Sequence, residues 1–103
     1  MIAEVASRRV ELADLCRRFG VRRLDLFGSA ARGDFDPERS DLDFLVEFDP
    51  DARTARSLGG YFDFKDSLET LFGRSVDLVE AGAIRNPYLK KSIEESQERL
   101  FEA

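Results

Sequence analysis

The chain has 103 residues, of which 43% are hydrophobic and 36% charged, and a formal net charge of −5. This length allows one hydrophobic core, so we expect a single domain that spans residues 1–103. Nucleic-acid binding depends on Lys and Arg side chains that neutralise phosphates, so the acidic balance argues against DNA or RNA and suits a basic protein partner. The N-terminal stretch is charged and shows no signal peptide or membrane segment, so we expect a cytoplasmic protein without a membrane partner.

The first predicted element is a helix over residues 3–19. Apolar residues recur there at helical spacing, and Gly20 is a suitable C-terminal stop. Cys16 lies on the apolar stripe, so we expect its side chain in the core. As the single cysteine it also excludes an intramolecular disulfide and a cysteine-based metal cluster. A strand follows at about residues 22–27.

The most informative stretch, residues 28–43, comes directly after this strand. Gly28 lets the backbone approach a ligand closely, and Ser29 adds a hydroxyl where a short helix could begin. Backbone N–H groups at such a helix start favour anionic phosphate oxygens. Gly33 limits the length of the helix, and residues 34–40 form a polar turn.

Two aspartates, Asp41 and Asp43, open the next predicted strand, which runs to about Phe48. Alternate residues of a strand share a face, so these carboxylates point the same way while the opposite face is uniformly apolar. Adjacent carboxylates repel each other unless a proton or cation lies between them. Mg²⁺ takes oxygen ligands and leaves room for substrate phosphates, so the pair indicates a divalent-metal site.

A charged segment, residues 49–57, reads as a loop that could flank a nucleotide. A helix is predicted from about Leu58 to Phe72, and Gly73 ends it, although Gly59 and Gly60 weaken its first turn. Its aromatic residues are assigned to the core rather than to an adenine platform. The core-facing stripe comprises Tyr61, Phe64, Leu68, Leu71 and Phe72.

A third carboxylate, Asp77, lies in a short predicted strand over residues 75–79. Val76 and Leu78 share the buried face, and Asp77 points the other way. Three aspartates on adjacent strands could hold two metal ions, which stabilise both oxygens of an in-line displacement. The chain has no histidine, so a carboxylate such as Asp77 is the natural general base. An aspartate at a sheet edge would look the same, so that alternative stays open.

The last predicted element is a helix over about residues 87–101, with Asn86 as its cap and Pro87 at its first position. The alternation of helices and strands predicts an α/β or α+β fold, with a small mixed sheet of about three strands flanked by about four helices. The residues that the final helix is expected to bury are Leu89, Ile93, Leu100 and Phe101.

Taken in order, three segments resemble the minimal nucleotidyltransferase (MNT) family of the DNA polymerase β superfamily. These segments are Leu26-Phe27-Gly28-Ser29-Ala30-Ala31-Arg32-Gly33, Ser40-Asp41-Leu42-Asp43-Phe44-Leu45-Val46 and Val76-Asp77-Leu78-Val79. The likeness covers nearly the whole chain and implies the nucleotidyltransferase (polymerase β-like) fold. One departure is the interval of eleven residues between Ser29 and Asp41, which is one residue longer than usual in the family.

The resemblance also implies roles for individual residues. Gly28 and Ser29 would hold the nucleotide phosphates, and Asp41, Asp43 and Asp77 would be the catalytic residues that bind Mg²⁺. Arg32, which belongs to the same motif, either contacts a phosphate or pairs with Asp34 or Asp36, and the residues leave both possibilities open.

Many small MNT proteins are antitoxins that are paired with a HEPN-type toxin, a ribonuclease, and transfer AMP from ATP to one of its tyrosines. The resemblance therefore implies a Mg²⁺-dependent protein adenylyltransferase that uses ATP and forms a hetero-oligomer with such a toxin. Two alternatives stay open. One is a non-catalytic, nucleotide-binding antitoxin that neutralises its partner by direct binding. The other is a nucleotidyltransferase for a small molecule such as an antibiotic, although a chain this short leaves little surface for an acceptor pocket.

Overall fold

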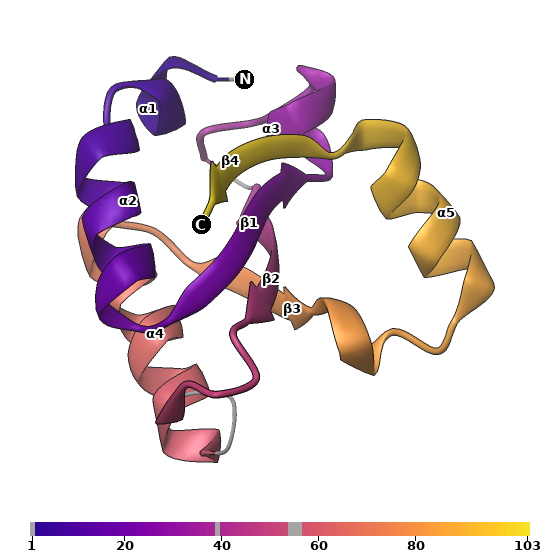
Figure 1. The fold of residues 1–103 in the computed structure, drawn as a ribbon. Helices are drawn as coiled ribbons and strands as arrows, with labels where there is room; N and C mark the ends of the chain where they lie inside the picture. Colours follow the sequence, from indigo (N-terminus) through magenta and orange to yellow (C-terminus); the bar gives the residue numbers. More distant parts are fainter. Residues whose placement is uncertain (1, 39, 54–56) are drawn as a thin grey trace.

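The computed structural model describes residues 2–38, 40–53 and 57–103 (Figure 1). Part of the predicted loop at 49–57, residues 54–56, lies outside them. None of the described helices combines the length and hydropathy that are needed to cross a lipid bilayer. In chain order the elements are α1 (Ala3–Ala6), α2 (Arg9–Arg18), β1 (Val21–Phe27), α3 (Ser29–Arg32), β2 (Leu42–Phe48), α4 (Leu58–Phe72), β3 (Val76–Glu80), the 3₁₀ helix η2 (Ala81–Ala83), α5 (Pro87–Ser96) and β4 (Glu98–Glu102).

The four strands form one mixed sheet in the order β3-β2-β1-β4. Strand β1 is antiparallel to both β2 and β4, and β2 is parallel to β3. Helices α2 and α4 lie on one side of the molecule and α5 on the opposite side (Figure 1). The predicted fold class, a small mixed sheet flanked by helices, is confirmed.

Alternation along β2 separates the core from the other face of the sheet. Every second residue from Leu42 to Phe48 is buried, and the residues between them are partly exposed. The Phe44 ring stacks on Phe72 at 5.8 Å between centroids, and Phe48 meets the edge of Phe64, also at 5.8 Å. Burying one such aromatic side chain contributes about 1.5–3 kcal/mol. The core thus lies between β2 and α4, and the opposite face of β2 is left for Asp43.

Helix α4 has the bounds that the sequence predicts. The Ser57 hydroxyl accepts a hydrogen bond from the Gly60 N–H at 3.2 Å, which caps the helix despite its glycine-rich first turn. Gly73 ends the helix in a left-handed conformation, with φ of +66°. The predicted stripe is confirmed as well: three of its members are buried, and Tyr61 and Leu71 pack against the core at partial exposure. The assignment of every aromatic residue of this helix to the core is wrong for Phe62, which is 49% exposed.

The predicted final helix is wrong beyond Ser96. The chain becomes extended at Gln97, and residues 98–102 form β4 instead, which pairs with β1. Without β4 the backbone groups along that edge of β1 would lack partners, so pairing outweighs continuing the helix. The sheet therefore has four strands rather than about three. Leu100 is buried as expected, although from a strand, whereas Leu89 is 40% exposed and does not belong to the core.

The predicted first helix consists of two helices. Helix α1 ends at Ala6 and α2 begins at Arg9. At the break, the Ser7 hydroxyl donates to the Glu4 carbonyl at 3.1 Å, a local bond that competes with helical hydrogen bonding. Both helices still cover the sheet, and the expected burial of Cys16 is confirmed.

Candidate active site

The turn after β1 is shaped by Gly28. This residue has φ of +73°, a conformation that side-chain-bearing residues rarely adopt. A Cβ atom at this position would overlap the carboxylate of Asp43 on β2. The Gly28 carbonyl accepts from the N–H groups of Ala31 and Arg32 at 3.1 and 3.0 Å, which starts the short helix α3. A glycine at position 28 is therefore required both by the turn and by the neighbouring acid.

Strand register gathers the predicted acidic residues at one end of the sheet. Asp43 is the partner of Phe27 on β1 and of Asp77 on β3. Asp43 is half-buried and Asp77 is exposed, while the exposed Asp41 lies directly before β2. Three adjacent strands thus bring the Gly28 turn and two of the three predicted carboxylates side by side.

The electrostatics of Asp43 show that the three carboxylates interact. The pKa of Asp43 is raised from 3.8 to about 6, mainly because its carboxylate is partly buried and, to a smaller extent, because of the negative charges of Asp77 and Asp41. The positive charge of Arg32 acts in the opposite direction. A carboxylate that is both partly desolvated and surrounded by like charges favours a cation or a proton beside it.

The three side chains fit a hard divalent cation such as Mg²⁺, because all of them are carboxylates. The charges of Asp77 and Asp41 also disfavour the ionised form of Asp43, which a bound cation would stabilise. Within residues 2–38, 40–53 and 57–103, no three carboxylate, thiol or imidazole side chains are already gathered into a metal-binding cluster. Metal binding by Asp41, Asp43 and Asp77 therefore stays a prediction from the chemistry of the donors.

Arg32, at the end of α3, has a described partner. Its guanidinium lies 3.5 Å from the Asp34 carboxylate, in an exposed ion pair. An exposed pair of this kind contributes little, about 0–1 kcal/mol, so Arg32 can exchange Asp34 for another anion at low cost. Because Arg32 also lowers the pKa of Asp43, it lies near the acidic cluster, and its contact with a phosphate stays a prediction.

A family model described as the nucleotidyltransferase domain matches residues 11–100. The chain belongs to this family. The match includes the Gly28 turn and all three aspartates, so the geometry above lies within the shared domain. The recognised resemblance is therefore confirmed, and this nucleotidyltransferase has the fold that its motifs predict.

Two curated relatives have names that state an activity. Protein adenylyltransferase MntA of Thermococcus cleftensis is 37% identical over 82 residues, which are 80% of this chain and 78% of that protein. A protein of Methanocaldococcus jannaschii with the provisional name protein adenylyltransferase MJ0128 is 46% identical over 83 residues, which are 79% of this chain and 78% of that protein.

Solved structures share the fold. One that is provisionally described as a minimal nucleotidyltransferase superposes with a TM-score of 0.74 at 34% identity, over 91% of this chain and 90% of that chain. A toxin–antitoxin structure with AMP-PNP superposes with a TM-score of 0.72 at 18% identity, over 92% of this chain and 73% of that chain. At that identity the likeness shows the fold alone.

Sequence reasoning missed several residues that surround the site of this nucleotidyltransferase. The Ser96 hydroxyl, at the end of α5, accepts from the Gly28 N–H at 3.1 Å. On α4, the Tyr61 hydroxyl donates to the Leu78 carbonyl, and the Glu69 carboxylate accepts from the Val76 N–H at 3.0 Å. Helical spacing assigns Tyr61 to the core, and no motif distinguishes Ser96 or Glu69.

Tyr61 keeps its proton beside the acidic cluster. Burial raises the pKa of its hydroxyl, and the charges of Glu80 and Asp77 raise it further. The side chain therefore remains a hydrogen-bond donor to β3 over the physiological pH range.

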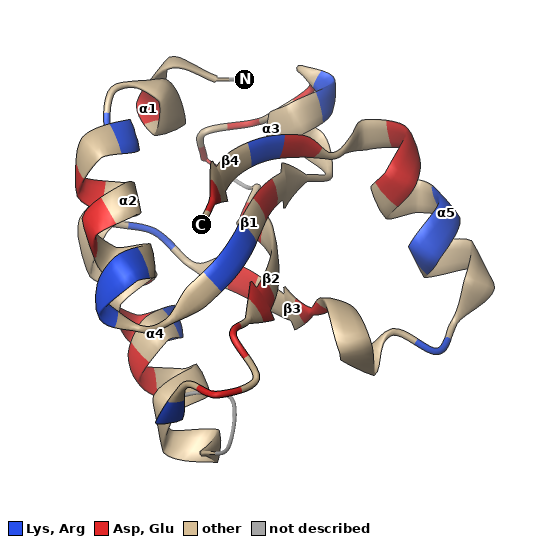
Figure 2. Cartoon of the chain, in the orientation of Figure 1, with Lys and Arg blue, Asp and Glu red and all other residues tan. Residues whose placement is uncertain are grey.

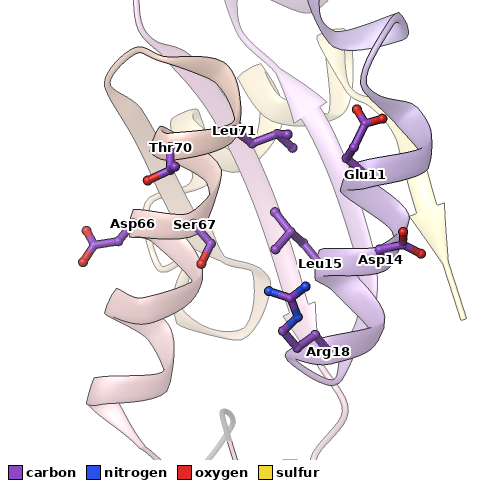
Figure 3. Close-up of a pocket in the computed structure, with 8 residues that line it drawn as sticks. All are labelled: Glu11, Asp14, Leu15, Arg18, Asp66, Ser67, Thr70 and Leu71. Atoms are coloured by element: carbon purple, nitrogen blue, oxygen red, sulfur yellow. The ribbon is translucent and has the colours of Figure 1, made fainter.

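A large cavity lies away from this site. It has a volume of about 460 Å³ and lies between α2 and α4, where Leu15 and Leu71 extend into the space between the helices (Figure 3). None of the three candidate metal ligands lines it. Cavity volume alone would thus place the candidate site between α2 and α4, whereas the charges and the strand register place it at Asp43.

Residues of both charges are distributed along the described part of the chain. In Figure 2, Lys and Arg residues are interspersed with Asp and Glu along the helices and strands rather than gathered into one stripe. The expectation that nucleic acid is not the main partner stays a prediction from the net charge of −5.

Proposed function

We propose that this nucleotidyltransferase transfers AMP from ATP to a hydroxyl group of a partner protein in a Mg²⁺-dependent reaction. The observation that carries the proposal is the register that sets Asp43 opposite Asp77, with the Gly28 turn on the adjoining strand. The names of the curated relatives support a protein as the acceptor.

Each residue has a distinct role in this proposal. The backbone at Gly28 and the hydroxyl of Ser29 hold the triphosphate, and Arg32 contacts one of its phosphates. Asp41, Asp43 and Asp77 hold Mg²⁺, which when bound neutralises charge on the phosphates and on the leaving group. The acceptor oxygen forms a bond to the α-phosphorus while the bond to pyrophosphate breaks. Asp77, which is exposed whereas Asp43 is half-buried, accepts the proton of the acceptor hydroxyl.

We infer further that the acceptor is a tyrosine of a HEPN-type toxin and that the chain acts as its antitoxin within a hetero-oligomer. The resemblance to MNT antitoxins suggests this partner, and a toxin–antitoxin structure with the same fold supports it. The net charge of −5 favours a partner with a basic surface.

The test uses ATP labelled at the α-phosphate, Mg²⁺ and the protein that the neighbouring gene encodes. Label should move to that protein, and Asp43→Asn should reduce transfer at least about a hundredfold, because an essential metal ligand is lost. The matched control is Asp66→Asn, which removes one exposed carboxylate of α4 and should transfer at the wild-type rate. Full transfer by Asp43→Asn would exclude the proposed site.

The same variant separates the remaining alternatives. If Asp43→Asn loses transfer but still neutralises the toxin in cells, the chain acts by direct binding, and catalysis is not its antitoxin mechanism. Release of pyrophosphate that requires an antibiotic instead of a protein would indicate a small-molecule acceptor.

A further inference from the structure

Strand β3, which carries Asp77, lies at an edge of the sheet. Successive residues of a strand direct their backbone groups to opposite edges. The Leu42 N–H donates to the Ser75 carbonyl at 3.2 Å, so Ser75 and Asp77 direct their backbone groups toward β2. Val76 and Leu78, on either side of Asp77, therefore direct theirs to the outer edge, where no further strand of the described residues pairs with them.

Two side chains of α4 take the place of a neighbouring strand. The Glu69 carboxylate accepts from the Val76 N–H at 3.0 Å, and the Tyr61 hydroxyl donates to the Leu78 carbonyl. Both hydrogen bonds are partly buried, so each would leave a polar backbone group poorly satisfied if it were lost. Helix α4 thus holds β3 at two points, one on each side of Asp77.

We propose that Tyr61 and Glu69 are positioning residues that hold β3 in register, so that the Asp77 carboxylate stays beside Asp43. Asp77 is exposed, so its position is set mainly by the backbone of its own strand. A shift of β3 along β2 would move Asp77 away from Asp43, its partner in the parallel register. The inference rests on the proposed function, because it assigns Asp77 a role in binding Mg²⁺.

A merely structural role predicts a different result. If the two bonds only attach α4 to the sheet, their loss lowers the melting temperature and leaves the metal requirement of the folded protein unchanged. If they position Asp77, their loss raises the Mg²⁺ concentration that half-maximal binding of a non-hydrolysable ATP analogue requires, at temperatures where the variant is fully folded.

The experiment compares three variants and one control in the full chain. Tyr61→Phe and Glu69→Ala each remove one bond to β3, whereas Glu69→Gln keeps an oxygen that accepts from the Val76 N–H. Tyr88→Phe, the control, removes the same hydroxyl from a tyrosine that is 84% exposed on α5. Calorimetry of the ATP analogue across a Mg²⁺ series gives the half-maximal concentration, and hydrogen exchange at the Val76 amide reports the bond itself.

We expect Tyr61→Phe and Glu69→Ala to raise the half-maximal Mg²⁺ concentration roughly tenfold, the lower limit for losing a partner that orients a metal ligand. Glu69→Gln should restore the wild-type value, Tyr88→Phe should leave it unchanged, and Val76 exchange should accelerate only in Glu69→Ala. If the wild type binds the ATP analogue but Tyr61→Phe and Glu69→Ala show an unchanged Mg²⁺ dependence, the positioning role is wrong and the proposed function still stands. A wild type that binds no nucleotide with Mg²⁺ overturns the proposed function and this inference with it.

Discussion

Asp25 and Arg99 face each other across the β1–β4 pair, and the Arg99 Nε lies 2.5 Å from Asp25 Oδ1. Asp25 is only 5% exposed, whereas the Arg99 side chain is 40% exposed and raised in pKa by this hydrogen bond. Removing the cation from a buried ion pair destabilises a protein strongly, by more than the intact pair contributes to its stability. The pair therefore fixes β4, the strand that the sequence did not predict, to the centre of the sheet.

Arg99→Ala should destabilise the protein by about 2–3 kcal/mol, because it leaves the Asp25 carboxylate buried without its partner. The double variant Asp25→Leu with Arg99→Leu should recover most of that loss, since neither charge remains. Urea unfolding of both variants and the wild type measures the difference. If the double variant is as unstable as Arg99→Ala, packing rather than charge governs this position.

Deprotonation of Asp43 should make the metal-free protein less stable as the pH rises. The pKa of Asp43 is raised from 3.8 to about 6, so between these values the folded state binds more protons at this site than the unfolded state does. Its contribution to stability is therefore present below about pH 4 and is lost as the pH rises to about 6. Asp43→Asn lacks this dependence.

The check is the melting temperature in a chelator at a series of pH values. The melting temperature of Asp43→Asn, relative to that of the wild type, should increase by a few degrees between pH 4 and pH 7. In a domain of this size, about 1 kcal/mol of stability corresponds to roughly 4 °C in melting temperature. Asp66→Asn on exposed α4 should show no comparable trend. A constant difference between Asp43→Asn and the wild type would mean that Asp43 titrates normally.

Gly28→Ala should cost more than an ordinary substitution at a left-handed glycine. Its Cβ would overlap the Asp43 carboxylate, whereas at Gly73, with φ of +66°, an added Cβ meets nothing within 4 Å. We expect Gly73→Ala to lose about 1 kcal/mol through backbone strain and Gly28→Ala to lose about 2–4 kcal/mol. Equal losses in denaturant titrations would show that Asp43 moves aside freely.

Arg74 should support the turn that precedes Asp41. Its guanidinium donates to Glu4 Oε1 and to the Pro37 carbonyl, each at 3.0 Å, and lies 4.8 Å from the centre of the Phe35 ring. Arg74→Gln should lose about 1–2 kcal/mol of unfolding free energy, because a partly buried set of charged hydrogen bonds is broken.

The control for Arg74 is Arg8→Gln. The Arg8 side chain forms an exposed ion pair with Glu11 at 3.8 Å, so the expected loss is under about 0.5 kcal/mol. A matching loss in the two variants would leave Arg74 without a special role in the turn.

The site was more predictable from the sequence than the end of the chain. Asp43 and Asp77 each interrupt a short apolar strand, and alternation alone places such residues on the face away from the core. Their alignment across β2 and β3 needed only that the two strands pair in parallel. These features are local or follow from a simple register.

The strand at residues 98–102 depended instead on a distant partner. Leu100 suits a helix stripe as well as a strand, and the choice is made by β1, more than seventy residues earlier in the chain. The hydrogen bond from the Tyr61 hydroxyl to β3 could not be predicted for the same reason, because helical spacing assigns this residue to the core. Long-range backbone pairing leaves no mark in a short window of sequence.

The bond between the Gly28 amide and the Ser96 hydroxyl ties the first turn of the site to the last turn of α5. One amide hydrogen cannot serve a hydroxyl and a phosphate oxygen equally well at the same moment. An anion that takes this donor therefore competes with Ser96. Binding of an anion at the Gly28 turn would then be coupled to release of the C-terminal end of α5.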